Sequence, residues 1–209
     1  MDAVYPRNLE RFARCFTRQG NLPDALRSYR DGLSIAERLA KSDPNNAGWQ
    51  RDLSVSYTKV GDVQVSQGNL PDALRSYRDG LSIAERLAQS DPNNAEWQRD
   101  LSVSYNKVGD VQVSQGNLPD ALRSYRADLA IAERLAQSDP NNARWQRDLS
   151  VSYAKLARAN RADGQLPQAR QNLAAGRAII ADLVARFPDW AVWKRDLAWF
   201  DAQIAELGP

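Results

Sequence analysis

The sequence predicts an all-α protein in which helical hairpins stack into a solenoid. Three observations predict this fold: a repeat of constant length, apolar residues spaced three and four apart within each repeat, and no sustained alternation of apolar and polar residues. A tryptophan recurs every 48 residues, at Trp49, Trp97, Trp145 and Trp193. Because such repeats bury their apolar faces only against their neighbours, residues 1–209 are expected to form a single solenoid domain.

The two central repeats, residues 49–96 and 97–144, are identical at 43 of 48 positions. The terminal repeats diverge more, which is typical of solenoids because their outer faces meet water. Each repeat is expected to form a hairpin of a first helix, called helix A, and a second helix, called helix B. The pattern predicts hairpins at about 6–43, 45–91, 93–139 and 141–187, followed by a capping helix at about 189–207.

Helix A of the second repeat is expected over residues 47–67. Its apolar residues recur at steps of three and four, at Trp49, Leu53, Tyr57 and Val60. Gly68 follows, and glycine readily takes the left-handed conformation that ends many helices. We therefore expect helix A to end just before Gly68.

Helix B of the same repeat is expected to begin after Asn69, whose side chain can cap the first turn. Pro71 is tolerated in that turn, where a backbone N–H would have no helical partner. Apolar residues then recur with helical spacing at Leu74, Tyr77, Leu81, Ala84 and Leu87. Pro92 disfavours helix for the residue before it and is expected to end helix B. The side chains of Asn93 and Asn94 can cap the next helix A, and Asn93 with Glu96 is a candidate capping box.

The middle of each repeat resembles the tetratricopeptide repeat (TPR) family in residues that, in the second repeat, are Tyr57-x2-Val60-Gly61, Ala73-x3-Tyr77 and Pro92. The period is longer than the family's roughly 34 residues, and the spacings place about seven extra residues, or about two turns, in each helix. We therefore identify an elongated TPR-like variant. The resemblance implies a right-handed α-solenoid in which helix A of each repeat lines a concave surface that binds proteins or peptides.

The side chains that lie about a quarter turn around helix A from Tyr57 are predicted to face this concave groove. They are Arg51, Val55, Thr58, Asp62 and Val65 in the second repeat, Arg99, Val103, Asn106, Asp110 and Val113 in the third, and Arg147, Val151, Ala154, Arg158 and Arg161 in the fourth. The groove is expected to be acidic in its centre and basic at both ends, which favours a peptide of mixed charge. The valines would be covered either by a partner or by neighbouring helices A, and the sequence leaves both alternatives open.

Several conspicuous residues are interpreted as structural. Three of the repeat tryptophans lie eight residues before a tyrosine, and all four are expected to pack in the core. Cys15 takes the place of valines in later repeats and is expected to pack as a small apolar side chain. Repeated Arg-Asp pairs, such as Arg51-Asp52, form either a ladder between repeats or a solvated face, and we favour the solvated face because surface pairs contribute little. Gln64 and Gln112 stand where the family has an aromatic residue.

Composition argues against most catalytic chemistry. The chain has no His and one Cys, and it lacks a phosphate-binding loop motif, so no catalytic residue, metal site or cofactor is expected. The net charge of +2 is small, and Asp62 and Asp110 interrupt the basic channel that nucleic acid would need. The sequence shows neither a signal peptide nor a membrane span, so we expect a cytoplasmic location and no membrane partner.

The sequence thus favours a non-enzymatic scaffold that binds a protein or peptide partner through the surface lined by helix A. The alternative is a structural or self-assembling element, such as a spacer or sensor module of a larger signalling system. Near-identical repeats also suit the stacking of one copy on another, so self-association is a further expectation.

Overall fold

A computed structural model of the chain describes residues 13–14, 16–17 and 19–208. Within this part of the chain the regular elements are helices, without a strand, which confirms the predicted all-α class. After residue 20 they are α2 (Leu22–Ser42), α3 (Ala47–Ser66), α4 (Leu70–Ser90), α5 (Ala95–Ser114), α6 (Leu118–Ser138), α7 (Ala143–Ala162), α8 (Leu166–Arg186) and α9 (Ala191–Glu206). Cys15, for which an apolar packing role is predicted, lies outside the described residues.

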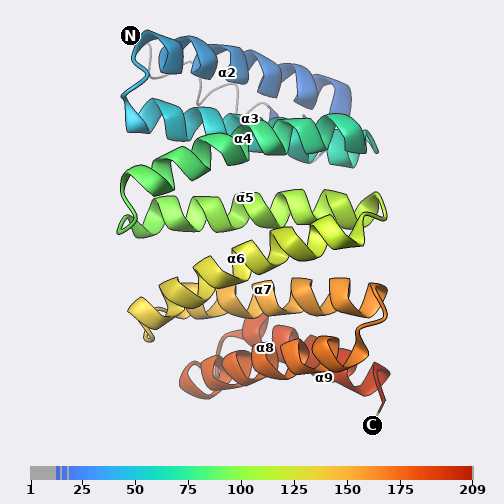
Figure 1. The fold of residues 1–209 in the computed structure, drawn as a ribbon. Helices are drawn as coiled ribbons and strands as arrows, with labels where there is room; N and C mark the ends of the chain where they lie inside the picture. Colours follow the sequence, from blue (N-terminus) through green and yellow to red (C-terminus); the bar gives the residue numbers. More distant parts are fainter. Residues whose placement is uncertain (1–12, 15, 18, 209) are drawn as a thin grey trace. The chain divides into compact units, whose positions relative to one another are not determined.

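The chain forms two compact units, residues 1–115 and 116–209, and each is described by itself. In the first unit, α3 packs against α2 and α4, α4 packs against α5, and α3 also touches α5 (Figure 1). In the second unit, α6 packs against α7, α7 against α8, and α8 against α9. These are the packed helix pairs predicted for a repeat array, while the prediction of a single domain stays a prediction.

An asparagine side chain caps the N-terminus of each of the helices α3, α5 and α7. It accepts a hydrogen bond of 3.1–3.2 Å from the backbone N–H of a tryptophan three residues on, at Asn46, Asn94 and Asn142. The cap of α5 is therefore Asn94, one of the two asparagines expected to cap it, and the capping box of Asn93 with Glu96 is wrong. Trp97 occupies the third position after the cap, so no carboxylate can reach back to complete a box.

The turn between helices A and B follows the prediction. Gly68 has a φ of +76°, in the left-handed region that favours glycine, and α3 ends two residues before it. Asn69 then caps α4, because its side chain accepts a hydrogen bond from the N–H of Asp72. Local sequence therefore sets the boundaries of both helices.

A glycine on helix A meets a tyrosine on helix B in the first unit. Gly61 is buried, and a Cβ atom there would lie 2.5 Å from Cε1 of Tyr77, so this approach requires glycine. Around the same tyrosine, Ala73, Val108 and Val111 complete a buried cluster. The two residues that carry much of the TPR resemblance thus set how closely helices A and B approach.

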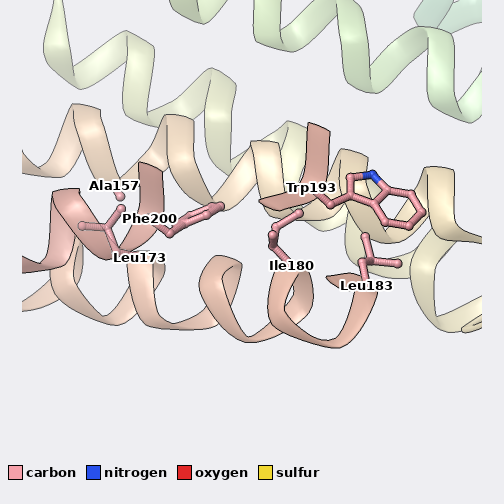
Figure 2. Packing of buried hydrophobic residues seen from close by; sticks show 6 residues of the cluster. All are labelled: Ala157, Leu173, Ile180, Leu183, Trp193 and Phe200. Carbon is pink, nitrogen blue, oxygen red and sulfur yellow. The ribbon is translucent and has the colours of Figure 1, made fainter. Parts of the chain in front are cut away.

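The core of the second unit is closed by α9. Ile180 and Leu183 of α8 cluster with Trp193 and Phe200 of α9, and Figure 2 shows Phe200 on the side of Leu173 and Trp193 on the side of Leu183. Trp193 is 5% exposed, which confirms its predicted core position. The other repeat tryptophans are only half-buried, namely Trp49, Trp97 and Trp145.

A buried amide replaces the aromatic residue that TPR proteins place on helix A. Gln64 is 4% exposed, and its Oε1 accepts a hydrogen bond of 2.8 Å from the hydroxyl of Ser76 on α4. A buried polar group with a partner costs little stability. The Gln64–Ser76 pair therefore explains how a polar residue fits between the two helices.

Candidate functional site

Ion pairs join α3 to α5 in the first unit and α7 to α9 in the second. Arg51 of α3 donates to the carboxylate of Asp100 of α5, and Arg147 of α7 donates from Nε to Asp196 of α9 at 3.0 Å. The pKa of Arg51 is raised, chiefly by its hydrogen bond to Asp100. For these residues the favoured interpretation, a solvated face, is therefore wrong. The arginines and aspartates instead form the ladder between repeats. Because the side chains are 25–41% exposed, each pair contributes only about 0–1 kcal/mol.

Asp62, predicted to make the groove acidic, is paired inside the first unit. Its Oδ1 accepts a hydrogen bond of 2.8 Å from the hydroxyl of Tyr77 and one of 2.7 Å from Nζ of Lys107. The pKa of Tyr77 is raised, first by burial and then by the negative charge of Asp62. The carboxylate therefore links α3 to α4 and α5, and its charge is already balanced before any partner arrives.

A second hydrogen bond joins helix A to the preceding helix B. The hydroxyl of a tyrosine donates to a glutamate Oε1 at 2.8–3.0 Å in three pairs, Tyr57–Glu37, Tyr105–Glu85 and Tyr153–Glu133. Burial, followed by this hydrogen bond, raises the pKa of each of these tyrosines to about 12. The tyrosines assigned to the apolar stripe thus also make a polar link between helices.

The first candidate site is a pocket of about 300 Å³ between α3 and α5, called here the α3–α5 pocket. It brings together three predicted site residues, Asp62, Val65 and Asp110, and adds Lys107. Val65 is 39% exposed and is the most accessible apolar side chain of this group. The pocket therefore combines one exposed apolar residue with charged groups.

The second candidate site is a cleft of about 160 Å³ between α7 and α9, called here the α7–α9 cleft. The residues of α7 that line it and were predicted to face the groove are Arg147, Val151, Ala154 and Arg158. From α9 it adds Trp199 and Phe200, whose rings meet edge to face with centroids 5.0 Å apart. This cleft is more apolar than the α3–α5 pocket and carries exposed arginine at Arg158.

The remaining predicted residues line neither site. Arg161 forms an ion pair of 2.8 Å with Glu206, and the hydroxyl of Thr58 donates to the carbonyl oxygen of Ser54. The others are half-buried, namely Arg51, Val55, Arg99, Val103, Asn106 and Val113. Each half-buried valine is partly covered by the protein and partly open, so both alternatives for the valines stay predictions.

Lys107 and Trp199 belong to these sites but not to the predicted set. Both carried a signal in the sequence. Trp199 follows Val151 by one period of 48 residues, so it has the same place on its helix. Lys107 follows Val103 by four residues and so shares its helix face. The predicted set lacks Trp199 because the helix at about 189–207 is predicted only as a cap, and it lacks Lys107 because this residue is not among the side chains predicted to face the groove.

No protein-family model and no curated protein matches the chain. Solved structures do match: a putative kinesin light chain from Podosopora anserina with nearly identical TPR-like repeats aligns with a TM-score of 0.68 and 18% identity, over 97% of this chain and 91% of that one. BtubC (BKLC) from P. vanneervenii aligns with a TM-score of 0.68 and 17% identity, over 85% and 64%. The apo form of RapI aligns with a TM-score of 0.66 and 10% identity, over 99% and 50%. The chain therefore has the predicted TPR-like fold, and it spans less than two thirds of BtubC and half of RapI.

In the part of the chain that the structure describes, none of the helices combines the length and hydrophobicity that crossing a membrane requires. Within the same residues, no three side chains of His, Cys, Asp or Glu gather in a way that could hold a metal ion. The α3–α5 pocket and the α7–α9 cleft are the candidate functional sites.

Proposed function

We propose that the protein is a non-enzymatic scaffold that binds a protein or peptide partner with the exposed sides of its helices A. One observation carries the proposal: seven predicted residues line two hollows, one between α3 and α5 and one between α7 and α9, namely Asp62, Val65, Asp110, Arg147, Val151, Ala154 and Arg158. Each hollow combines apolar side chains with a few charged groups, which is the usual make-up of a binding site.

The fold and the composition support this proposal. Arrays of helical repeats offer extended surfaces to which partners bind. The absence of His from the sequence removes the commonest general base, so a catalytic role has less support. The proposal accordingly includes no cofactor and no metal.

Selection of peptides from a random library on the immobilised protein, followed by affinity measurements in solution, tests the scaffold function. Val65→Glu in the α3–α5 pocket and Arg158→Glu in the α7–α9 cleft each change an exposed side chain. At least one of them is expected to weaken the binding of selected peptides about tenfold or more, because central interface residues dominate affinity.

The matched control is Leu166→Glu. Leu166 is 48% exposed on α8, a helix B, so the same carboxylate is added away from both candidate sites. A library that yields no binding peptide, or peptides that bind all three variants equally well, would contradict the scaffold function.

Exposed apolar side chains around the start of α9 favour a second candidate function, self-association. Trp190 is 58% exposed and Val192 is 40% exposed, and Trp190 stacks on Trp193 with ring centroids 4.7 Å apart. Light scattering is expected to show a mass that rises with concentration and that falls back when Trp190 and Val192 are both replaced by serine. The mass of a single chain at every concentration would exclude this function.

A further inference from the structure

A group of three polar residues in the first unit is replaced as a whole two repeats later. In the first unit, Asp62 accepts hydrogen bonds from Tyr77 and Lys107. The equivalent positions, each 96 residues further on, hold Arg158, Leu173 and Gln203. A guanidinium has no acceptor, so it cannot take over the role of the carboxylate. Arg158 is exposed and has neither an ion pair nor a hydrogen bond within the described residues.

The helix that faces Arg158 changes in the same repeat. Trp199 and Phe200 occupy places that Val103 and Ser104 hold 96 residues earlier. Trp199 is 37% exposed, and both rings line the α7–α9 cleft of about 160 Å³. Because an apolar cavity of about 150 Å³ holds a benzene ring, the cleft has room for one side chain of the size of leucine or phenylalanine.

Among the described residues, the charged groups that line the cleft leave one cation without an ion pair. Three basic residues line it, Arg147, Lys155 and Arg158, against one carboxylate, Asp196. Arg147 is engaged with Asp196, and Lys155 has an interaction of its own. Arg158 therefore presents a guanidinium beside an apolar cleft, and a guanidinium pairs with a carboxylate through two parallel hydrogen bonds.

We propose that the α7–α9 cleft binds an acidic peptide segment, with one Leu- or Phe-sized side chain placed beside Trp199 and an adjacent carboxylate paired with Arg158. This inference rests on the proposed scaffold function and adds the chemistry of the partner and the part of the chain that recognises it. Burial against Trp199 supplies affinity, and the pairing with Arg158 selects acidic over basic segments.

A single-stranded nucleic acid is the other ligand that an arginine beside a tryptophan can bind. Such binding uses a continuous basic groove with several aromatic platforms. The cleft instead offers one available guanidinium and contains the carboxylate of Asp196. The observations therefore favour the acidic peptide, and nucleic-acid binding is an outcome that the test must distinguish.

Fluorescence anisotropy with three labelled probe peptides tests the inference. The first probe has glutamates on both sides of one phenylalanine, the second has lysines in place of the glutamates, and the third has serine in place of the phenylalanine. The first probe is expected to bind about tenfold or more tightly than the other two. Trp199→Ala and Arg158→Glu are each expected to weaken it about tenfold, and Arg158→Glu is expected to shift the preference towards the lysine probe.

Arg126→Glu is the matched control, because Arg126 is exposed on α6 and makes no ion pair within the described residues. Circular dichroism checks that each variant is folded. Equal binding of the three probes, an Arg158→Glu protein that binds like Arg126→Glu, or tighter binding of labelled oligouridine would overturn the inference. If library peptides respond to Val65→Glu but not to Arg158→Glu, the scaffold function stands and this inference fails. If they respond to neither variant, the scaffold function fails.

Discussion

At the scale of single residues, several charged side chains of helix A make ion pairs and hydrogen bonds with other residues of the protein itself. Arg51 holds Asp100, and Asp62 holds Tyr77 and Lys107. Arg51 and Asp62 are among the positions predicted to contact a partner in the groove. A loss of binding after their substitution would therefore have to be separated from a loss of stability, whereas Val65 and Arg158 are free of this complication.

Asp62→Ala is expected to lower the free energy of unfolding by about 1–3 kcal/mol, because Tyr77 and Lys107 lose their shared acceptor. The carboxylate and the ammonium are 34% and 35% exposed, which places the ion-pair part of the loss at the low end of its range. Asp62→Asn retains an acceptor for Tyr77 and is expected to lose less. Urea denaturation measures the loss, and Asp31→Ala, at an exposed site, serves as the control with a change within about 0.5 kcal/mol. Equal stability of the two alanine variants would contradict this role of Asp62.

The tyrosines of helix A predict how stability depends on alkaline pH. Their folded pKa of about 12 lies above the unfolded value of 10.0, so folding favours the neutral hydroxyl. Their contribution is complete below about pH 10 and is lost as the pH rises towards about 12. Urea denaturation at a series of pH values is expected to show this fall, with a smaller slope for Tyr57→Phe. A flat profile, or the same slope in the variant, would contradict the prediction.

At the scale of helices, one close contact positions helix B on helix A. Gly61 lets the ring of Tyr77 approach the backbone of α3, and the same ring hydroxyl then reaches Asp62. The turn at Gly68 and the cap at Asn69 bring the two helices into this arrangement. Local signals and one tertiary contact therefore cooperate in the hairpin of α3 and α4.

Two glycine substitutions separate these effects. Gly61→Ala places a Cβ atom 2.5 Å from Cε1 of Tyr77 and is expected to destabilise the protein by about 1–3 kcal/mol. Gly32→Ala in α2 meets nothing within 4 Å and is expected to stabilise it by about 0.5–1 kcal/mol, because alanine favours the helix. Urea denaturation of both variants measures the difference. Changes of the same sign in the two variants would contradict the prediction that the approach of Tyr77 requires glycine at position 61.

At the scale of the whole molecule, α9 has a double role in the second unit. It covers the core formed by Ile180 and Leu183, and it supplies Trp199 and Phe200 to the α7–α9 cleft. The capping helix predicted from the sequence is thus also one wall of a candidate site.

The closing role of α9 is testable with two tryptophans that lie close together. Trp193→Ala is expected to cost about 3–5 kcal/mol, because the indole is 5% exposed within the core of the second unit. Trp190→Ala is expected to change stability by less than about 1 kcal/mol, because that side chain is 58% exposed. Urea denaturation followed by circular dichroism compares them. Similar costs for the two variants would mean that α9 does not seal the core.

The repeat, the hairpins and nearly every helix boundary could be predicted from the sequence alone. Gly68, Asn69 and Pro71 act within a single turn, and a period of 48 residues copies that turn along the chain. At the caps, the capping box of Asn93 with Glu96 is wrong, because the adjacent Asn94 caps the helix instead.

The pairing of the candidate site residues was decided by tertiary structure. Lys107 and Asp62 lie 45 residues apart in the chain, and whether they meet depends on the distance between two helices A, on which a local pattern carries no information. The same packing places Arg158 beside Trp199 in the α7–α9 cleft, where Arg158 has no ion pair within the described residues. The sequence by itself determined which helices form, because the signals act over one or two turns, and only the packing of these helices decided which charges are used internally and which face a partner.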